Sequence, residues 1–283
     1  MLAASMKGRS KMLVHRSRRS FGWFGFGKRV KSRTDGYEQC HVVLNFKACE
    51  MGRLLVDKIA KKAPGKRVIA VAADVKEQRS GYSEQVEFFE ADLGEKEGLA
   101  ELINYMHECK YSIETLFHNY PRILKIEGEE NSLDHFKDIM AQIIQQPMIT
   151  NSEILQEELI CADPSASERQ ATIFHSILRQ KGIYSILQGT FMHMERCLES
   201  DLKKHKTSVV QIDPGIYSSE HLSNIPNAPK SLNTSSTQII PAEVVAETIS
   251  SQIINHRVLE SPKINLYDLL SEYSEPPYYK EIK

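Results

Sequence analysis

Short apolar segments alternate with longer amphipathic segments along most of the chain. Seven apolar runs of strand length predict β-strands at residues 40–46, 67–74, 86–93, 113–119, 171–176, 208–215 and 263–267. Between these runs, apolar residues recur at helical spacing, which predicts helices at residues 50–63, 99–108, 133–159, 184–202 and 242–254. The alternation predicts an α/β fold, a doubly wound parallel sheet with helices on both faces.

The first 34 residues differ from the rest of the chain in charge. They contain ten Lys and Arg residues and no acidic residue, which leaves 26 basic against 37 acidic residues from Asp35 onwards. An Arg-rich, Ser-containing, acid-poor composition is typical of a mitochondrial targeting segment, and a basic tail that binds nucleic acid is the alternative. We therefore expect a basic N-terminal arm at 1–36, an α/β domain at 37–270 and an extended C-terminal tail at 271–283.

The composition narrows the class of protein. Apolar residues make up 41% and charged residues 26% of the 283 residues, which is ordinary for a globular protein. No apolar run approaches the roughly 20 residues that span a bilayer, so contact with an anionic membrane would be peripheral. The five cysteines are scattered without a CxxC motif, which predicts buried thiols and no metal site or disulfide framework.

Four short motifs occur in a fixed order along the predicted α/β domain. They are "ADL" (91–93), "LFHNY" (116–120), "YSILQ" (184–188) and "DPGIYSS" (213–219). With the predicted elements around them, these motifs resemble the classical short-chain dehydrogenase/reductase family from about Cys40 to Tyr267. The resemblance implies a Rossmann-like fold and an NAD(P)-dependent oxidoreductase ancestry. It also implies that four positions once contacted the cofactor: Asp92, Asn119, Pro214 and Gly215.

The turn that would hold the cofactor diphosphate departs from the family pattern. The family has Thr-Gly-x-x-x-Gly-x-Gly, whose glycines let the backbone approach the phosphates. Here residues 45–52 are "NFKACEMG", so Phe46 and Glu50 replace two glycines and only Gly52 remains. A carboxylate about 4 Å from a phosphate charge costs about 4 kcal/mol at an effective dielectric constant of about 20. We therefore expect this turn to be blocked, and we interpret Asp74, near the ribose position, as a solvated residue at a strand end.

The catalytic positions implied by the resemblance are also altered. Tyr184 is kept, but Gln188 stands where the family has its lysine and Gln142 stands where it has its asparagine. Ser176 aligns with the family's serine, with a shorter segment between it and Tyr184 than the family has. A tyrosine with a pKa near 10 lies three units from neutrality, about 4 kcal/mol, and an uncharged glutamine cannot lower that pKa by Coulomb attraction. Tyr184 is therefore interpreted as a packing residue.

Two histidines, His118 and His175, lie at the ends of neighbouring predicted strands. We expect both to face the former cofactor cleft. The preferred interpretation is a pair of hydrogen-bonded core residues, and a new site is the alternative.

Three hypotheses for function follow. The first is a non-catalytic structural or accessory subunit of a mitochondrial multiprotein assembly, with a respiratory-chain complex on the matrix side of the inner membrane as first choice. It would hold no cofactor, and it would contact protein subunits through its arm and tail. The second is an active NAD(P)-dependent oxidoreductase that reduces a carbonyl. The third is a subunit of the mitochondrial ribosome or of an RNA-processing complex, which is less favoured because the chain from Asp35 onwards is net acidic.

Overall fold

The computed structural model describes residues 36–75, 81–119, 137, 140–160, 171–176, 183–202, 207–215, 217, 239–255 and 263–275, with the backbone alone at 142, 143, 183–188 and 201. The chain divides into two units, Met1–Ser32 and Arg33–Lys283. All the described residues belong to the second unit. The predicted arm and tail lie outside the described residues, apart from residues 36 and 271–275.

Seven parallel strands form one sheet in the order β3-β2-β1-β4-β5-β6-β7. The strands are β1 (Glu38–Leu44), β2 (Arg67–Ala72), β3 (Val86–Glu90), β4 (Tyr111–Asn119), β5 (Ala171–Ser176), β6 (Thr207–Asp213) and β7 (Lys263–Asn265). Every residue of β4, β5 and β6 is buried, as expected for parallel strands covered on both faces. The strand order reverses direction between β1 and β4, which is where sheets of this kind bind their ligands.

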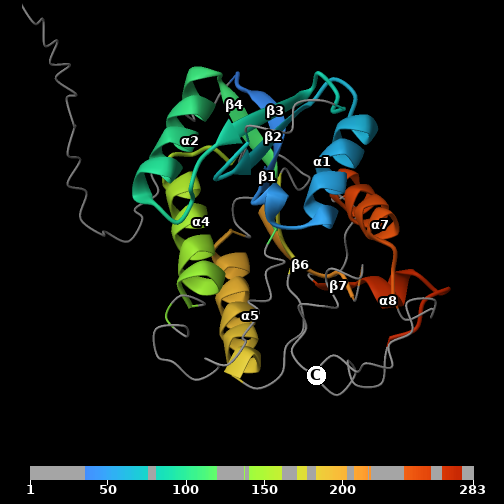
Figure 1. Ribbon diagram of the computed structural model, residues 1–283. Coiled ribbons are helices and arrows are strands. Elements are labelled where there is room, and N and C mark those ends of the chain that lie inside the picture. Colours follow the sequence, from blue (N-terminus) through green and yellow to red (C-terminus); the bar gives the residue numbers. More distant parts are fainter. Residues whose placement is uncertain are drawn as a thin grey trace, which may run out of the picture. The chain divides into compact units, whose positions relative to one another are not determined.

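Helices cover both faces of the sheet, and the predicted doubly wound α/β fold is confirmed (Figure 1). α1 and α7 pack on one face, and α2, α4 and α5 pack on the other. The helical elements are the 3-10 turn η1 (Phe46–Ala48), α1 (Glu50–Lys62), α2 (Lys96–Glu108), the π-helical turn η2 (Ala141–Gln145), α4 (Gln146–Gln156), α5 (Ile183–Leu202), α7 (Ala242–Ile254) and α8 (Leu266–Leu269).

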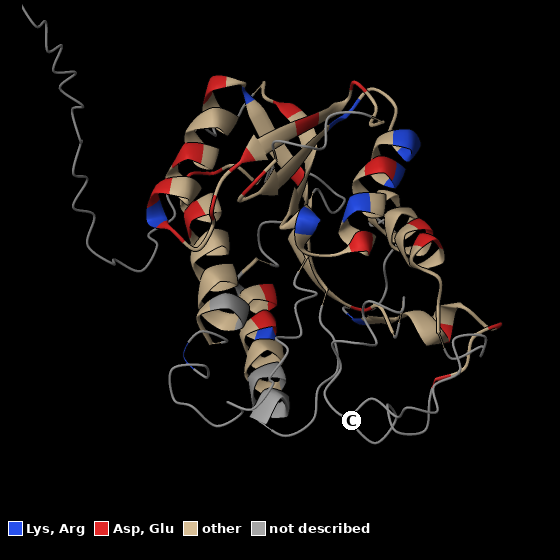
Figure 2. Cartoon of the chain, in the orientation of Figure 1, with Lys and Arg blue, Asp and Glu red and all other residues tan. Residues whose placement is uncertain are grey.

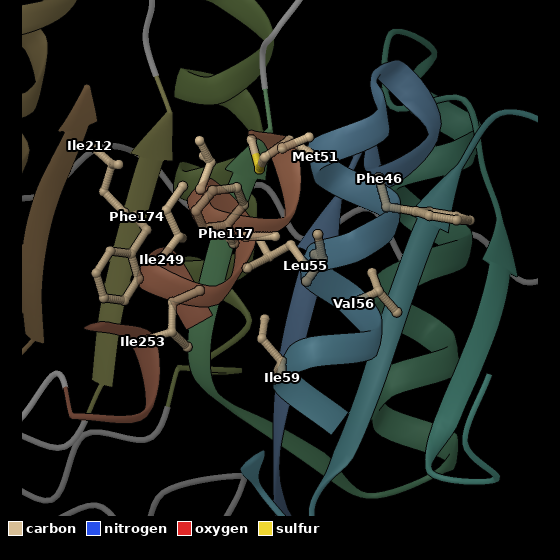
Figure 3. Close-up of a cluster of buried hydrophobic side chains, with 14 of the residues drawn as sticks. Phe46, Met51, Leu55, Val56, Ile59, Phe117, Phe174, Ile212, Ile249 and Ile253 are labelled. Carbon is tan, nitrogen blue, oxygen red and sulfur yellow. The ribbon is translucent and has the colours of Figure 1, made fainter. Parts of the chain in front are cut away.

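The core on the α1 and α7 face follows from the spacing of apolar residues in α1. Leu55 and Ile59 lie one turn apart, so both point from α1 toward the sheet and belong to one hydrophobic cluster with Phe117 of β4 and Phe174 of β5 (Figure 3). All four side chains are fully buried. Each such side chain contributes about 1.5–3 kcal/mol relative to an exposed one, so this face fixes α1 firmly at the end of β1.

The strands predicted to reach residues 46, 74, 93 and 215 end two or three residues earlier, and the structure corrects two further elements more substantially. The last predicted strand ends at Asn265, because the Asn265 side chain accepts a hydrogen bond from the Tyr267 amide at 3.1 Å and begins a helix at Leu266. The long helix predicted to reach residue 159 ends at Gln156 and contains the π-helical turn η2. Pro147 is the second residue of α4, two positions after that turn ends, and its missing N–H explains the interruption of the α-helical ladder.

Charge is unevenly distributed over the helices (Figure 2). α2 carries the exposed acidic residues Glu97, Glu101 and Glu108. On the other face, Lys58 and Lys62 of α1 form ion pairs with Glu247 of α7 at 3.0 and 2.5 Å. The basic residues of α1 are thus partly neutralised by α7. None of the helices that the structure describes is long and apolar enough to cross a bilayer.

Candidate functional site

The turn from β1 into α1 is built around a buried aromatic ring. Asn45 adopts a left-handed conformation (φ 55°) and leads into η1. The Phe46 side chain is fully buried, and its ring centroid lies 5.5 Å from that of Phe88 on β3. Phe46 therefore serves as a core residue that anchors this turn to the sheet. The sequence had predicted only that its side chain would fill space at the turn.

The N-terminus of α1 is capped by a thiol of the chain itself. The Gly52 amide donates to the Cys49 sulfur at 3.4 Å, and the Tyr217 hydroxyl donates to the same sulfur at 3.4 Å. Burial raises the pKa of Cys49, so the cap is a neutral thiol. Free amide groups at a helix N-terminus are what a phosphate would use, and here the Gly52 amide is already bonded.

Tyr217 reaches this cap from the segment that follows β6. Gly215 has a left-handed conformation (φ 71°), and a Cβ atom there would lie 2.8 Å from the Tyr267 ring. Beyond this tight turn Tyr217 forms a β-bridge with Ile240, and its side chain is 2% exposed. Tyr217 was not identified from the sequence, although an aromatic residue just after the Pro-Gly turn is the signal that could have found it.

Gly52 and Asn119, two positions implied by the sequence resemblance, pack closely against the β1–α1 turn. A Cβ atom at Gly52 would lie 2.3 Å from both Asn119 Nδ2 and the Phe46 carbonyl oxygen. The Asn119 amide donates to the Asn45 carbonyl at 3.1 Å, which ties the end of β4 to the turn after β1. Together these contacts close the backbone of the turn on itself.

Three other positions for which the resemblance implies cofactor contact are separate from this cluster of contacts. Asp74 is exposed, two residues beyond β2. Asp92 is also exposed, and its Oδ1 accepts a hydrogen bond from the Gly94 amide at 2.8 Å within the turn before α2. Pro214 is buried after β6. None of these three positions contributes to the cap of α1.

The catalytic positions are only partly described. Ser176, 2% exposed, ends β5 and pairs in register with Asn119 of β4. Tyr184 and Gln188 lie in the first turns of α5, and Gln142 lies in η2. Their side chains fall outside the described residues, so the interpretation of Tyr184 as a packing residue remains a prediction.

The two histidines form part of a buried polar chain. The His118 Nε2 lies 2.8 Å from Asn151 Oδ1, and the Asn151 Nδ2 lies 3.4 Å from His175 Nε2. The His175 Nδ1 then lies 2.7 Å from Glu195 Oε1 on α5. Both histidines are completely buried. They are hydrogen-bonded core residues that contact Asn151 of α4 and Glu195 of α5, so the preferred interpretation of the pair is confirmed.

Burial is the largest cause of the pKa shifts of His118, His175 and Glu195. It lowers the pKa of His175 to about 3, and burial together with the neighbouring His175 lowers the pKa of His118 well below its usual value. Burial also raises the pKa of Glu195 to about 8, although Lys263 opposes the change. Both histidines are therefore neutral near pH 7, and Glu195 titrates close to neutrality.

The pH dependence of stability follows from these shifts. Glu195 has a pKa in the folded state above its ordinary value of 4.5. Its contribution to the free energy of unfolding is therefore complete below about pH 4.5 and is lost as the pH rises toward 8. The pKa of His175 is shifted in the opposite direction, from 6.5 to about 3. The contribution of His175 to the free energy of unfolding is therefore lost only as the pH falls below 6.5. Between pH 6.5 and 9 we expect the free energy of unfolding to fall by about 2 kcal/mol, at 1.36 kcal/mol per pKa unit. Urea denaturation at several pH values measures this, and Glu195→Gln should flatten the curve; an equal fall in that variant would contradict the assignment.

The described residues provide no cluster suited to a metal ion, and the β1–α1 turn departs from the usual phosphate-binding pattern. They contain no group of three or more His, Cys, Asp or Glu side chains that could hold a metal ion. At the β1–α1 turn, the Gly52 amide is bonded to Cys49 and residue 50 is a glutamate. The turn thus lacks the glycine-lined approach that a diphosphate requires.

The comparisons with known proteins show the fold. A 3-ketoacyl-(acyl-carrier-protein) reductase from Brucella melitensis, solved with NADH, superposes with a TM-score of 0.65 and 13% sequence identity, over 81% of this chain and 97% of its own. The fold is that of the classical short-chain dehydrogenases/reductases. Pseudomonas aeruginosa RhlG, solved as an NADP active-site complex, superposes with a TM-score of 0.64 and 17% sequence identity, over 80% of this chain and 94% of its own. A Serratia marcescens short-chain dehydrogenase/reductase superposes with a TM-score of 0.62 and 14% sequence identity, over 81% of this chain and 95% of its own. No protein-family model and no curated protein matches the sequence.

Proposed function

We propose that this chain is a degenerate relative of the short-chain dehydrogenases/reductases that acts as a non-catalytic accessory subunit of a mitochondrial assembly. The observation that carries the proposal is the cap on α1. Cys49 and Tyr217 occupy the helix N-terminus where this fold type takes up the diphosphate of its cofactor. The chain's own side chains thus stand in place of the ligand.

Binding a dinucleotide at this turn would carry several costs. It would expose the Tyr217 side chain, which is 2% exposed, at about 1.5–3 kcal/mol. It would break the hydrogen bond from Tyr217 to Cys49, at about 1 kcal/mol. It would also bring phosphate charge to the Glu50 carboxylate in the first turn of α1, at about 4 kcal/mol. These terms oppose any affinity that the rest of the cleft retains.

Nucleotide binding tests the non-catalytic part of the proposal. We expect NADH and NADPH, each at about 1 mM, to leave the melting temperature of the purified chain unchanged. A ligand present at 100 times its Kd stabilises by about 2.7 kcal/mol, which would raise the Tm of a protein of this size by several degrees. The Brucella melitensis reductase, solved with NADH, is the positive control. A dose-dependent rise in Tm for this chain would overturn the proposal.

The size of the native particle tests the accessory-subunit part. The basic arm (1–36) and the tail (271–283) are the proposed contacts with neighbouring subunits, and a respiratory-chain complex on the matrix side of the inner membrane is the proposed assembly. We expect native material from mitochondria to migrate as a particle far larger than the 32.3 kDa chain. Migration as a monomer, dimer or tetramer would contradict the assembly without bearing on nucleotide binding.

An active NAD(P)-dependent carbonyl reductase is the second candidate. It is favoured by the cofactor-bound neighbours, the Brucella enzyme with NADH and Pseudomonas RhlG with NADP, and by the retained Tyr184. The thermal-shift experiment separates it from the first proposal, because such an enzyme must bind a nicotinamide nucleotide. Reduction of a carbonyl substrate with Tyr184 as proton donor would follow only if binding is found.

A role on RNA is the third candidate and rests on the basic arm. The acidic residues on α2 (Figure 2) disfavour a domain that lies on phosphates. If the arm alone binds RNA, affinity should fall steeply with salt and disappear when residues 1–33 are removed.

A further inference from the structure

A continuous hydrogen-bond chain crosses the layer between the sheet and the helices on its α4 and α5 face. It runs from His118 on β4 through Asn151 on α4 and His175 on β5 to Glu195 on α5. The four side chains are 0%, 3%, 0% and 7% exposed. Buried polar groups are stable only when they are hydrogen-bonded, so this chain contributes to holding α4 and α5 in place.

Each link in the chain can point in either direction. In one direction, His118 Nε2–H donates to Asn151 Oδ1, Asn151 Nδ2–H donates to His175 Nε2, and His175 Nδ1–H donates to an ionised Glu195. In the other, a protonated Glu195 donates to His175 Nδ1, and His175 Nε2–H donates to Asn151 Oδ1 after the amide has rotated. Asn151 Nδ2–H then donates to His118 Nε2. In both arrangements each of the three links has one donor and one acceptor.

We propose that these four residues form a two-state proton switch, in which the uptake of one proton by Glu195 reverses every hydrogen bond from α5 to β4. Each histidine carries one proton in both states, and only its position on the ring changes. The net reaction is the binding of one proton to the Glu195 carboxylate, so no oxidant or further reactant is involved. The switch is independent of whether the chain binds a nucleotide.

The surroundings set the pH at which the switch operates. Among the described residues, the ionisable groups that act on the chain are Lys263 of β7, which favours the ionised carboxylate, and Glu199 of α5, which favours the protonated one. His175 also acts on His118, and the two ring centroids are 4.7 Å apart. With burial as the largest influence, the pKa of Glu195 lies at about 8, so the transition falls within the range that a cell compartment can cover.

Histidine tautomers give a direct test. In ¹⁵N NMR spectra of the full chain between pH 5.5 and 9.5, His118 should change from the Nδ1–H to the Nε2–H form as the pH rises. His175 should change in the opposite sense, with the same midpoint near pH 8. A structural network without a switch would keep both tautomers fixed over this range, and that result would overturn the proposal.

Three variants sharpen the test. Glu195→Gln keeps the size and hydrogen-bonding capacity of the side chain but cannot titrate, so the coupled exchange should disappear. Glu199→Gln and Lys263→Met keep Glu195, and they should move the midpoint to lower and higher pH, respectively. Glu199→Gln and Lys263→Met test the switch even if Glu195→Gln fails to fold. Exchange that persists in Glu195→Gln, or midpoints that do not move, would exclude Glu195 as the proton acceptor.

Discussion

Phe46→Ala is expected to lower the free energy of unfolding by about 3–5 kcal/mol. The Phe46 ring is fully buried and packs against Phe88, so its removal leaves a cavity beneath the turn that joins β1 to α1. The surrounding strands cannot collapse to fill it, because β1 is held on both sides by β2 and β4. Urea denaturation with a fluorescence or circular dichroism signal measures the change.

Lys47→Ala is the matched control for Phe46, because it alters the next residue of the same 3-10 turn. Lys47 is only partly buried, and its replacement should change the stability by no more than about 0.5 kcal/mol. A loss below 1 kcal/mol for Phe46→Ala would show that the ring is not a core anchor. The description of the turn as a closed, packed element would then be wrong.

Gly52→Ala is expected to cost about 2–3 kcal/mol, although alanine is normally the better helix former by about 1 kcal/mol. The added Cβ atom would lie 2.3 Å from Asn119 Nδ2 and from the Phe46 carbonyl oxygen. A side chain could turn aside, but a backbone carbonyl can move only if η1 or α1 shifts. Thermal and urea denaturation both report the loss.

Gly189→Ala provides the contrast, since Gly189 also lies in a helix, but a Cβ atom added there would have nothing within 4 Å. It should leave stability unchanged or raise it by up to about 1 kcal/mol. If the two glycine variants behave alike, the close contact at Gly52 does not limit how α1 approaches β1.

Much of the fold was predictable because its strands are short, apolar and separated by amphipathic helices. Strand β5 matches its predicted bounds, and helix α7 does so as well. The errors arose where a local polar contact overrides hydrophobic pattern. Asn265 starts a helix in an apolar stretch that was predicted to remain extended, and Pro147 interrupts a helix whose apolar spacing continues across it.

The cap on α1 was harder to predict from the sequence than the replacement of glycines in the β1–α1 turn. The substitutions at Phe46 and Glu50 are visible in the sequence, but the contact between Tyr217 and Cys49 joins residues 168 positions apart. No local pattern specifies such a pair. A cysteine three residues before a glycine at a helix start gives only a weak indication of capping.

The polar chain could have been found in part. Its histidines were identified from the ends of their strands, whereas Asn151 and Glu195 were not. Glu195 lies one helical turn after Phe191, a fully buried residue, so it stands on the apolar side of α5. Asn151 occupies the corresponding position before buried Ile154 in α4. An isolated polar residue at a core position of a helix is therefore the signal that was missed.

The placement of β1 at the middle of the sheet bears on how the chain acquires its structure during synthesis. Both neighbours of β1 come later in the sequence, and β4 is not complete until residue 119. The four strands β3, β2, β1 and β4 nevertheless form an uninterrupted block within residues 38–119, so this block can assemble on the ribosome before β5 is translated. Strands β5, β6 and β7 each lie beside the strand that precedes them in the sequence, so they can be added in order at the open edge of this block.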